Sequence, residues 1–575
     1  MTVGSDRLLR RAVRAGGGWT VLLGVTALLG AAAELLLPAA LGRAVDAALD
    51  GSPGWWPAAA CALVAVLAGT DTLGDLAAGT GTARATARLR HQLLRHVFAL
   101  DPRTAGRHPV GDLVARLVGQ AADAGQAGST VVYGLVAVLP PVGSLVALTL
   151  IEPLLGITFV AGLVLLTVLM RAFVTDASAA MTGYQRTQGL IAGRLHEAVA
   201  GHRTVAAAGT VPAEIDRILV PLPLLRGHGR RSWQTLARAA GRNAAVAPLL
   251  SLAVVAVGGW SVAAGWLTPG QLVAAVQYAA LGTGLGAVTA TLNRLVRTRA
   301  GAGRIAEVLA QPTRTYGPAR VPATGAGTLT FDAVTVRAPD GRTVLHRVDL
   351  HLPGGRALAV VGASGAGKST FAAVAGRLRD PDEGEVRLDG VPLHRLSHDE
   401  LRRSVGYGFE RPVLVGDTVA DVIDLGVPAG AADDPGRRLG RVRRSARAAA
   451  VDGFAERLPD GYRTALADAP MSGGEAQRLG LARALHGGRL LVLDDATSSV
   501  DTATEYRIAR AVAEHGDGRT RVIVTHRATT AAAADLVAWL DDGRLRALAS
   551  HARLWTDPAY RAVFQPAGEP AGRPG

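Results

Sequence analysis

Six long apolar runs in the first half of the chain limit its fold more than any other feature. They cover residues 19–41, 55–78, 131–151, 154–174, 244–266 and 271–296. A helix of about 20 residues crosses the roughly 30 Å hydrocarbon core of a bilayer, and each run reaches that length. The mean hydropathy of +0.24 agrees with a membrane protein. The runs therefore predict an all-α membrane domain of six transmembrane helices with a lipid bilayer as its surroundings.

The connections between these runs alternate between short and arginine-rich. The three short connections contain a single basic residue, Arg43. The long ones carry seven arginines from Arg84 to Arg116 and ten from Arg171 to Arg242. Because basic loops stay on the cytoplasmic side, the N-terminus and both long connections are expected there. Six spans return the chain to the same side, so we predict a multi-pass protein of the cell membrane with both termini cytoplasmic.

Composition excludes several other functions. A net charge of +14 could indicate nucleic-acid binding. The arginines nevertheless gather between apolar runs, as they do in the cytoplasmic loops of membrane proteins, so no nucleic-acid partner is predicted. The single cysteine, Cys61, excludes an intrachain disulfide and a cysteine metal cluster.

The second half of the chain has the pattern of a soluble α/β domain. Composition shifts to Pro, Gly and Thr around Arg314–Gly327, which marks a linker. Beyond it, short apolar runs such as 329–336, 357–361, 490–493 and 521–525 alternate with helical stretches, an order that favours a largely parallel, covered sheet. The predicted divisions are a membrane domain (1–313), a linker (314–327), a nucleotide-binding domain (328–565) and a disordered tail (566–575).

A phosphate-binding loop follows the second of these strands. Residues 362–370 match the pattern G-x-x-x-x-G-K-[ST]: Gly362, Ala363, Ser364, Gly365, Ala366, Gly367, Lys368, Ser369 and Thr370. Lys368 is the only lysine among 61 basic residues. A slim ammonium fits beneath nucleotide phosphates where a planar guanidinium does not. Backbone N–H groups and a helix N-terminus would cradle the phosphates, and Ser369 would supply a ligand to Mg²⁺. The chain is predicted to bind a nucleoside triphosphate.

Further motifs downstream are weak individually. Asp494 ends the apolar run 490–493 and would deliver a carboxylate beside Mg²⁺, although many core strands end in Asp. The segment Ser472, Gly473, Gly474 and Glu475 opens a helix and could bind an anion, but it also fits an ordinary helix cap. His526 follows another apolar run and would be unremarkable alone.

Taken in their order, these motifs resemble those of an ABC ATPase. With six spans fused in front, the chain resembles a bacterial ABC exporter half-transporter over nearly its whole length. The resemblance implies a dimer of two such chains, as homodimer or heterodimer, in which ATP is held between one phosphate loop and the partner's signature segment, Ser472 to Glu475. It also implies that Asp501 lies in a loop at the dimer interface.

The resemblance assigns roles at the catalytic end as well. Asp494 would hold Mg²⁺ together with Ser369, Asp495 would polarise the attacking water, and His526 would contact the γ-phosphate. Glu410 occupies the position of a glutamine that links Mg²⁺ to the membrane domain in the family.

Four positions depart from the family pattern. The position at which an aromatic would stack on adenine falls near Ala338, where no aromatic occurs, leaving Tyr316 or Phe331 as possible substitutes. The catalytic glutamate is replaced by Asp495, the linking glutamine by Glu410, and the last signature glutamine by Glu475. Two interpretations follow: family drift with full activity, or a chain that contributes a weak ATP site to a heterodimer.

Polar residues within the spans are the only sequence indication of the cargo. Glu34, Asp71 and Gln277 form the candidate translocation path, since an intramembrane acid should face a wet cavity or a partner. We predict ATP-driven export of an amphipathic small molecule, peptide or lipid. A catalytically weak subunit, or an importer built on the exporter fold, is the alternative, and the cargo itself has no signature in the sequence.

Overall fold

The computed structural model describes residues 2–51, 54–282, 285–427, 435–486, 488–514 and 518–564. It divides into two compact units. The first contains Met1–Phe98 and Pro109–Gln311, and the second contains Ala99–His108 and Pro312–Gly575. The second unit thus takes in residues 99–108, which the predicted divisions assign to the membrane domain. The predicted tail lies outside the described residues.

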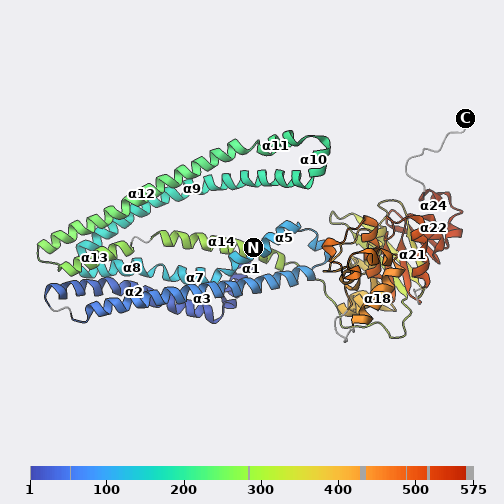
Figure 1. The fold of residues 1–575 in the computed structure, drawn as a ribbon, viewed down its shortest axis with the longest axis horizontal. Helices are drawn as coiled ribbons and strands as arrows, with labels where there is room; N and C mark the ends of the chain where they lie inside the picture. Colours follow the sequence, from blue (N-terminus) through green and yellow to red (C-terminus); the bar gives the residue numbers. More distant parts are fainter. Residues whose placement is uncertain are drawn as a thin grey trace. The chain divides into compact units, whose positions relative to one another are not determined.

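The first unit is helical throughout its described residues (Figure 1). Its elements are α1 (Thr2–Ala15), α2 (Gly18–Leu49), α3 (Trp56–Ala99), α5 (Val110–Ala115), a π-helical turn (Arg116–Gln120), α6 (Ala121–Gly125), α7 (Ala127–Val136), α8 (Leu139–Ile151), α9 (Pro153–Ala200), α10 (His202–Ala208), α11 (Val211–Leu219), α12 (Leu222–Ala263), α13 (Pro269–Gly282) and α14 (Leu285–Leu309).

The six predicted runs all fall on these helices. Among the described residues, the helical stretches 18–49, 56–99 and 110–151 are long and apolar enough to cross a membrane, and 153–164 and 248–263 are shorter apolar stretches. The third run is divided between α7 and α8 just before Pro140 and Pro141, since proline starts a helix more readily than it continues one. The sixth run is shared by α13 and α14.

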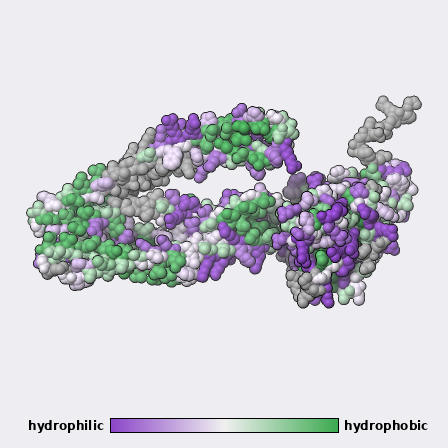
Figure 2. Space-filling view, in the orientation of Figure 1, coloured by the Kyte–Doolittle hydropathy of each residue, from purple (hydrophilic) through white to green (hydrophobic). Residues whose placement is uncertain are grey.

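Large apolar side chains lie on the outside of these helices. Val21, Leu28 and Leu36 of α2 are all more than half exposed. Figure 2 shows apolar side chains spread over the surface of this unit, whereas the visible surface of the other unit is more polar. A soluble protein rarely exposes an apolar area of this size, and lipid would cover it. The predicted helical membrane domain is confirmed.

Close backbone contacts join the membrane helices. α9 and α12 run side by side as one long hairpin that carries α10 and α11 at its end (Figure 1). α2 and α13 approach each other closely at Gly42 and Gly270. A side chain on Gly42 would lie only 2.5 Å from the Gly270 carbonyl oxygen, so this contact has room for glycine alone. Asp46 accepts hydrogen bonds from Gly270 N at 2.7 Å and from the Thr268 hydroxyl at 2.6 Å, which caps α13.

The second unit contains two sheets. A four-stranded antiparallel sheet has the order β2-β1-β4-β5, and a six-stranded sheet has the order β10-β9-β3-β8-β7-β6. In the larger sheet only the β9–β10 pair is antiparallel. The strands are β1 (Leu329–Arg337), β2 (Thr343–Leu352), β3 (Ala357–Val361), β4 (Glu383–Leu388), β5 (Val391–Pro392), β6 (Val405–Gly408), β7 (Leu490–Asp494), β8 (Thr520–Val524), β9 (Leu536–Asp541) and β10 (Arg544–Ala549).

Helices surround these sheets and complete the predicted α/β fold. They are α4 (Pro102–Ala105), α15 (Lys368–Ala375), α16 (His398–Ser404), α17 (Val419–Asp424), α18 (Pro435–Ala448), α19 (Asp452–Arg457), α20 (Gly473–Ala484), α21 (Thr502–Glu514), α22 (Ala528–Ala533), α23 (His551–Leu554) and α24 (Pro558–Ala562), with short 3₁₀ turns at Leu393–Arg395, Gly461–Arg463 and Leu466–Asp468. Every residue of β3 is buried, as expected for a central parallel strand covered on both faces. The carboxyl ends of β3, β6, β7 and β8 therefore share one edge, to which the predicted motifs attach.

The start of the predicted linker is packed into this unit. The Arg314 backbone N–H donates to the Ala99 carbonyl at 3.0 Å, and the Arg314 side chain pairs with Asp101. Its guanidinium also donates to the carbonyls of Arg377 and Leu378 at 2.8 Å and 2.7 Å. Residues 99–108 are thus fixed to the segment that follows α15 through the Arg314 side chain.

Candidate functional site

The phosphate loop connects β3 to α15 in the predicted place. Gly365 has φ 85° and Gly367 has φ 97°, a left-handed region that glycine enters without strain. At Gly367 a side chain would also lie 2.9 Å from the Val344 carbonyl oxygen. Both backbone conformation and space therefore require glycine immediately before Lys368.

Lys368 is turned into this loop. Its Nζ donates hydrogen bonds to the carbonyls of Gly362 and Ala363, both at 2.9 Å, and the side chain is buried. Burial lowers the pKa of Lys368, whereas the charges of Asp495 and Asp494 act in the opposite direction. A single cation at the base of the loop, close to two carboxylates, provides the charge that an anionic phosphate requires.

Asp494 ends β7 beside the loop. The hydroxyl of Ser369 shares a hydrogen bond with its carboxylate, and the Tyr407 hydroxyl lies 3.4 Å from Asp494 Oδ2. Asp494 Oδ1 is buried and has no hydrogen-bond partner within the described chain. Burial raises the pKa of Asp494, and the neighbouring charges of Asp495 and Glu410 act in the same direction.

Asp494 and Ser369 fit a Mg²⁺ ion that also takes ligands from substrate and water better than they fit a metal ion bound entirely by protein side chains. No group of three or more His, Cys, Asp or Glu side chains able to hold a metal occurs among the described residues. Mg²⁺ is usually bound by one or two protein oxygens, substrate phosphates and water. The unpartnered Asp494 oxygen next to the Ser369 hydroxyl has the chemistry of such a partial ligand set.

Asp495 and His526 lie together on the other side of Asp494. The Nε2 atom of His526 is 3.2 Å from Asp495 Oδ2. Asp495 has φ 46°, a left-handed conformation that Asp tolerates better than most residues. Burial raises the pKa of Asp495, and the charges of His526 and Lys368 oppose this shift. The pair combines a carboxylate able to accept a proton with an imidazole able to donate a hydrogen bond.

Glu410 follows β6 and is half-exposed. Its carboxylate is 3.7 Å from Arg411 Nε, and its charge contributes to raising the pKa of both Asp494 and Asp495. The structure therefore brings Glu410 near the two aspartates.

Gln477, to which no sequence motif assigns a role, connects the segments around Glu410 and Asp495. Gln477 is buried in α20, and its Nε2 donates to the Glu410 carbonyl at 3.0 Å, the Asp495 carbonyl at 3.2 Å and the Ser498 hydroxyl at 3.1 Å. Its Oε1 accepts from Ser499 N at 3.0 Å. The sequence shows only that a glutamine stands two residues after Glu475, and its burial and contacts become visible in the structure.

The segment at Ser472 forms a closed capping box at the start of α20. Glu475 N donates to Ser472 Oγ at 3.3 Å, while the Ser472 N–H and hydroxyl both donate to Glu475 Oε2, at 2.7 Å and 2.8 Å. These hydrogen bonds, from the Ser472 backbone first, lower the pKa of Glu475. The hydroxyl of Ser472 is therefore engaged by an ionised side chain of its own chain.

Asp501 also caps a helix. Its Oδ1 accepts from Thr504 N at 2.9 Å at the start of α21, and the same hydrogen bond lowers the pKa of its exposed carboxyl group. The cap fixes the end of the loop that begins at Asp495.

The two proposed substitutes for the adenine aromatic are already packed. Phe331 stacks on Phe371 with ring centres 4.4 Å apart, and Tyr316 lies against the guanidinium of Arg377 at 4.8 Å. Ala338 begins the turn between β1 and β2, with its N–H donating to the Arg342 carbonyl at 2.7 Å. Neither aromatic is therefore free to stack on a base.

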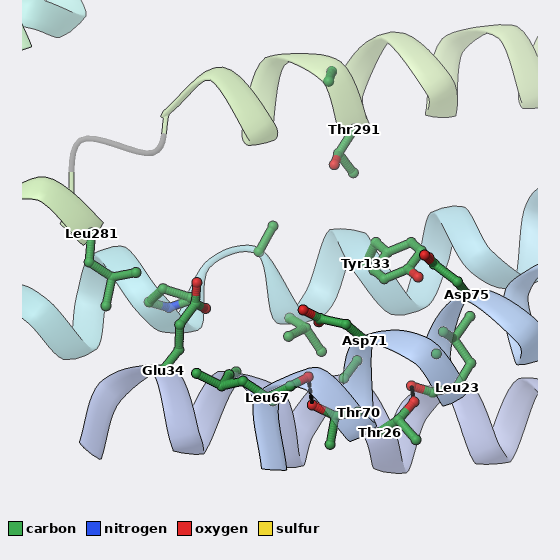
Figure 3. Close-up of a pocket in the computed structure, with 18 of the residues that line it drawn as sticks. Leu23, Thr26, Glu34, Leu67, Thr70, Asp71, Asp75, Tyr133, Leu281 and Thr291 are labelled. Carbon is green, nitrogen blue, oxygen red and sulfur yellow. Dashed lines mark hydrogen bonds between the residues drawn. The ribbon is translucent and has the colours of Figure 1, made fainter. Parts of the chain in front are cut away.

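A second candidate site lies in the membrane unit. A cavity of about 810 Å³ is lined by residues of α2, α3, α7, α8, α13 and α14 (Figure 3). Glu34 and Asp71 of the predicted path line it, whereas Gln277 does not. Asp75, Tyr133 and Arg294 also line it and were not predicted from the sequence.

Comparison with known proteins places both units in one family. Residues 20–284 match the family described as ABC transporter transmembrane region, and residues 345–498 match the family described as ABC transporter. The chain is 46% identical over 547 residues to ABC transporter ATP-binding protein RamA of Streptomyces coelicolor, covering 95% of this chain and 85% of that protein. The chain belongs to the ABC transporter family, as an ATP-binding/permease half-transporter.

Two further similarities bear on the fold. The mycobactin import ATP-binding/permease protein IrtB of Mycolicibacterium smegmatis is 34% identical over 420 residues, covering 71% of this chain and 70% of that protein. A solved structure of a bacterial Atm1-family ABC exporter with ATP bound superposes with a TM-score of 0.75 at 25% identity, covering 95% of this chain and 98% of that one. The chain is thus a multi-pass membrane protein of the exporter fold that binds ATP and couples its hydrolysis to transport.

Proposed function

We propose that this chain is one half of an ATP-driven exporter for an amphipathic small molecule, peptide or lipid. The observation that carries the proposal is the meeting of Lys368, Asp494 and the Asp495–His526 pair at one edge of the sheet, in a chain whose other unit is a membrane domain. The exporter fold of the solved relative supports outward transport. The arginine-rich connections support a cell-membrane orientation with both termini in the cytoplasm.

In this proposal the described residues divide the work at the ATP site. Loop residues Gly362 to Thr370 bind the phosphates, and Lys368 leaves the Gly362 and Ala363 carbonyls to pair with them. Ser369 and Asp494, with Glu410 nearby, hold Mg²⁺, which when bound neutralises charge that develops on the transferred phosphoryl group. Asp495 orients the attacking water, and His526 holds the γ-phosphate side of the site.

The signature segment is proposed to act on a partner's ATP. Ser472, Gly473 and Gly474 present backbone N–H groups at the start of α20, where a helix dipole favours an anion. Asp501 would lie at the dimer interface. In this proposal the chain works with a second half-transporter, either another copy of itself or a different chain.

A second candidate is a catalytically weak subunit of a heterodimer. Three observations favour it: Asp495 is one methylene shorter than glutamate, Glu475 engages Ser472, and Ala338 offers no ring for adenine. The two candidates differ in the ATPase rate of the purified chain alone, which is high for a self-sufficient homodimer and low for the weak subunit.

Inverted membrane vesicles that contain only this transporter test the direction. Export predicts ATP-dependent accumulation of a fluorescent amphiphile inside such vesicles, tested with neutral, cationic and anionic dyes. The Lys368→Ala variant is the matched control and should not accumulate dye. ATP-dependent depletion of preloaded dye would instead show an importer on the exporter fold, the direction named for IrtB.

A further inference from the structure

Charged residues are rare in the apolar runs, and nearly all of them meet in one place. The six runs contain five charged residues: Glu34, Asp71, Asp75, Arg171 and Arg294. Four of the five line the 810 Å³ cavity, and the side chain of Arg171 lies outside the described residues. Three acids and one arginine give this cavity a formal charge of −2, in a chain whose net charge is +14.

The acids share one side of their helices. Asp71 and Asp75 are four residues apart on α3, which places them one above the other on the same face. Figure 3 shows the side chains of Glu34, Asp71 and Asp75 around the cavity, with Glu34 below Leu281 and Asp71 and Asp75 on the side of Thr291 and Tyr133. α3 starts at Trp56, so Asp71 lies about 22 Å along the helix at 1.5 Å per residue, well within the membrane-spanning stretch.

These charged side chains form no salt bridges in the part of the chain that the structure describes. No salt bridge joins Glu34, Asp71, Asp75 or Arg294 to another side chain among the described residues. Like charges in apolar surroundings repel strongly, and intramembrane acids normally face a partner or a wet cavity. Here the missing counter-charge can be brought by the ligand.

The remaining walls suit an apolar body. Leu23, Leu67 and Leu281 supply aliphatic surface, and Tyr133 supplies an aromatic ring able to lie against a cation. Cavities of roughly 300–1,000 Å³ accommodate drug-sized ligands. The hydroxyls of Thr26 and Thr70 already donate to backbone carbonyls of their own helices, so they are less available to a ligand than the carboxylates.

We propose that this cavity binds a hydrophobic cation, with the positive group of the ligand held by Glu34, Asp71 and Asp75. This inference rests on the proposed transport function and specifies its cargo class. Arg294 lines the same cavity with the opposite charge, so it is expected to weaken the binding of a cation.

The probe pair is tetraphenylphosphonium and tetraphenylborate, which have nearly the same shape and opposite charge. Binding is measured by equilibrium dialysis of the radiolabelled ions against the full chain in phosphatidylcholine nanodiscs without ATP. Each ion is compared between variants rather than with the other ion, because the two partition differently into lipid. The variants are the triple change Glu34→Gln, Asp71→Asn and Asp75→Asn, the single change Arg294→Gln, and Glu152→Gln as a control acid outside the cavity.

We expect the triple variant to bind tetraphenylphosphonium at least about tenfold more weakly, with tetraphenylborate binding unchanged or stronger. Arg294→Gln should bind the cation several-fold more tightly, a gain that misfolding does not produce. Glu152→Gln should match the parent chain. Unchanged cation binding in the triple variant, or an equal loss in Glu152→Gln, would overturn the inference. Cation binding needs no ATP, so its loss is separable from failure of transport in inverted vesicles.

Discussion

The phosphate loop and the catalytic end of the ATP site achieve their chemistry by different means. In the loop, phosphate binding depends mainly on backbone geometry. Gly365 and Gly367 have positive φ, and the lysine is hydrogen-bonded to loop carbonyls. At the catalytic end, the decisive groups are side chains of specific length and charge, chiefly Asp495, Glu410 and Glu475. The departures from the family pattern all lie outside the loop. Phosphate binding is therefore expected to be sound in this chain, while turnover is expected to be reduced.

The largest effect is expected where the loop depends on one side chain. Lys368→Arg keeps the charge but replaces a slim ammonium with a planar group in a buried site. ATP-dependent dye accumulation should fall by about 100-fold, nearly as far as in Lys368→Ala. Retention of more than about half of the activity would contradict the distinction between a rigid loop and a tunable catalytic end.

A smaller loss is expected at the contact that holds the catalytic end together. Gln477→Leu removes hydrogen bonds to the Glu410 and Asp495 carbonyls and to Ser498, leaving buried groups unpaired. ATPase should fall about tenfold or more, with ATP affinity changed less than about threefold. Gln477→Glu retains the acceptor for Ser499 N but sets a carboxylate against the Glu410 and Asp495 carbonyls, so it should lose at least as much. An equal fall in ATP affinity would mean that Gln477 supports the whole fold rather than this end of the site.

Contact with the adenine base is expected to become stronger when an aromatic ring replaces Ala338. Ala338→Tyr places a ring at the turn where β1 passes to β2, and stacking on a base contributes roughly 1–3 kcal/mol. Binding of a fluorescent ATP analogue should tighten about tenfold. Ala338→Leu, which adds bulk without a ring, is the control. Equal tightening in both variants would point to apolar contact rather than to stacking.

The smallest change is expected at the signature segment. Glu475→Gln removes one negative charge while keeping an acceptor for the Ser472 hydroxyl. Because this side chain is partly solvated, ATP-dependent dimer formation should increase only about two- to fivefold. Glu456→Gln, an exposed acid on neighbouring α19, should have no effect. A larger gain in the control would indicate general charge repulsion rather than a local effect at Ser472.

Much of the fold could be predicted because it depends on local patterns. Run length predicts the membrane helices, and the phosphate loop identifies itself by glycine spacing around Lys368. The spacing of Ser472 and Glu475 also indicates a capping box, in line with the helix cap that the sequence left open as an alternative to an anion site.

Other features depend on contacts between distant segments. Gln477 joins backbone groups near residues 410, 495 and 499, which no local pattern connects. The cavity brings together charges from α2, α3 and α14, so no local sequence pattern singles out Asp75 and Arg294 as lining residues. Tyr316 and Phe331 were plausible adenine contacts until their packing partners were known.

The ATPase rate of the purified chain alone, measured beside Asp495→Glu, tests the central claim most directly. A one-methylene shortening moves the carboxylate about 1 Å from the water it must orient, which can lower the rate by roughly 100-fold. Parent and variant should bind Mg²⁺-ATP equally, and Asp495→Glu should hydrolyse it at least about ten times faster. Rapid hydrolysis by the parent chain that falls in Asp495→Glu would contradict the account. It would indicate a self-sufficient homodimer whose site is built for the shorter acid.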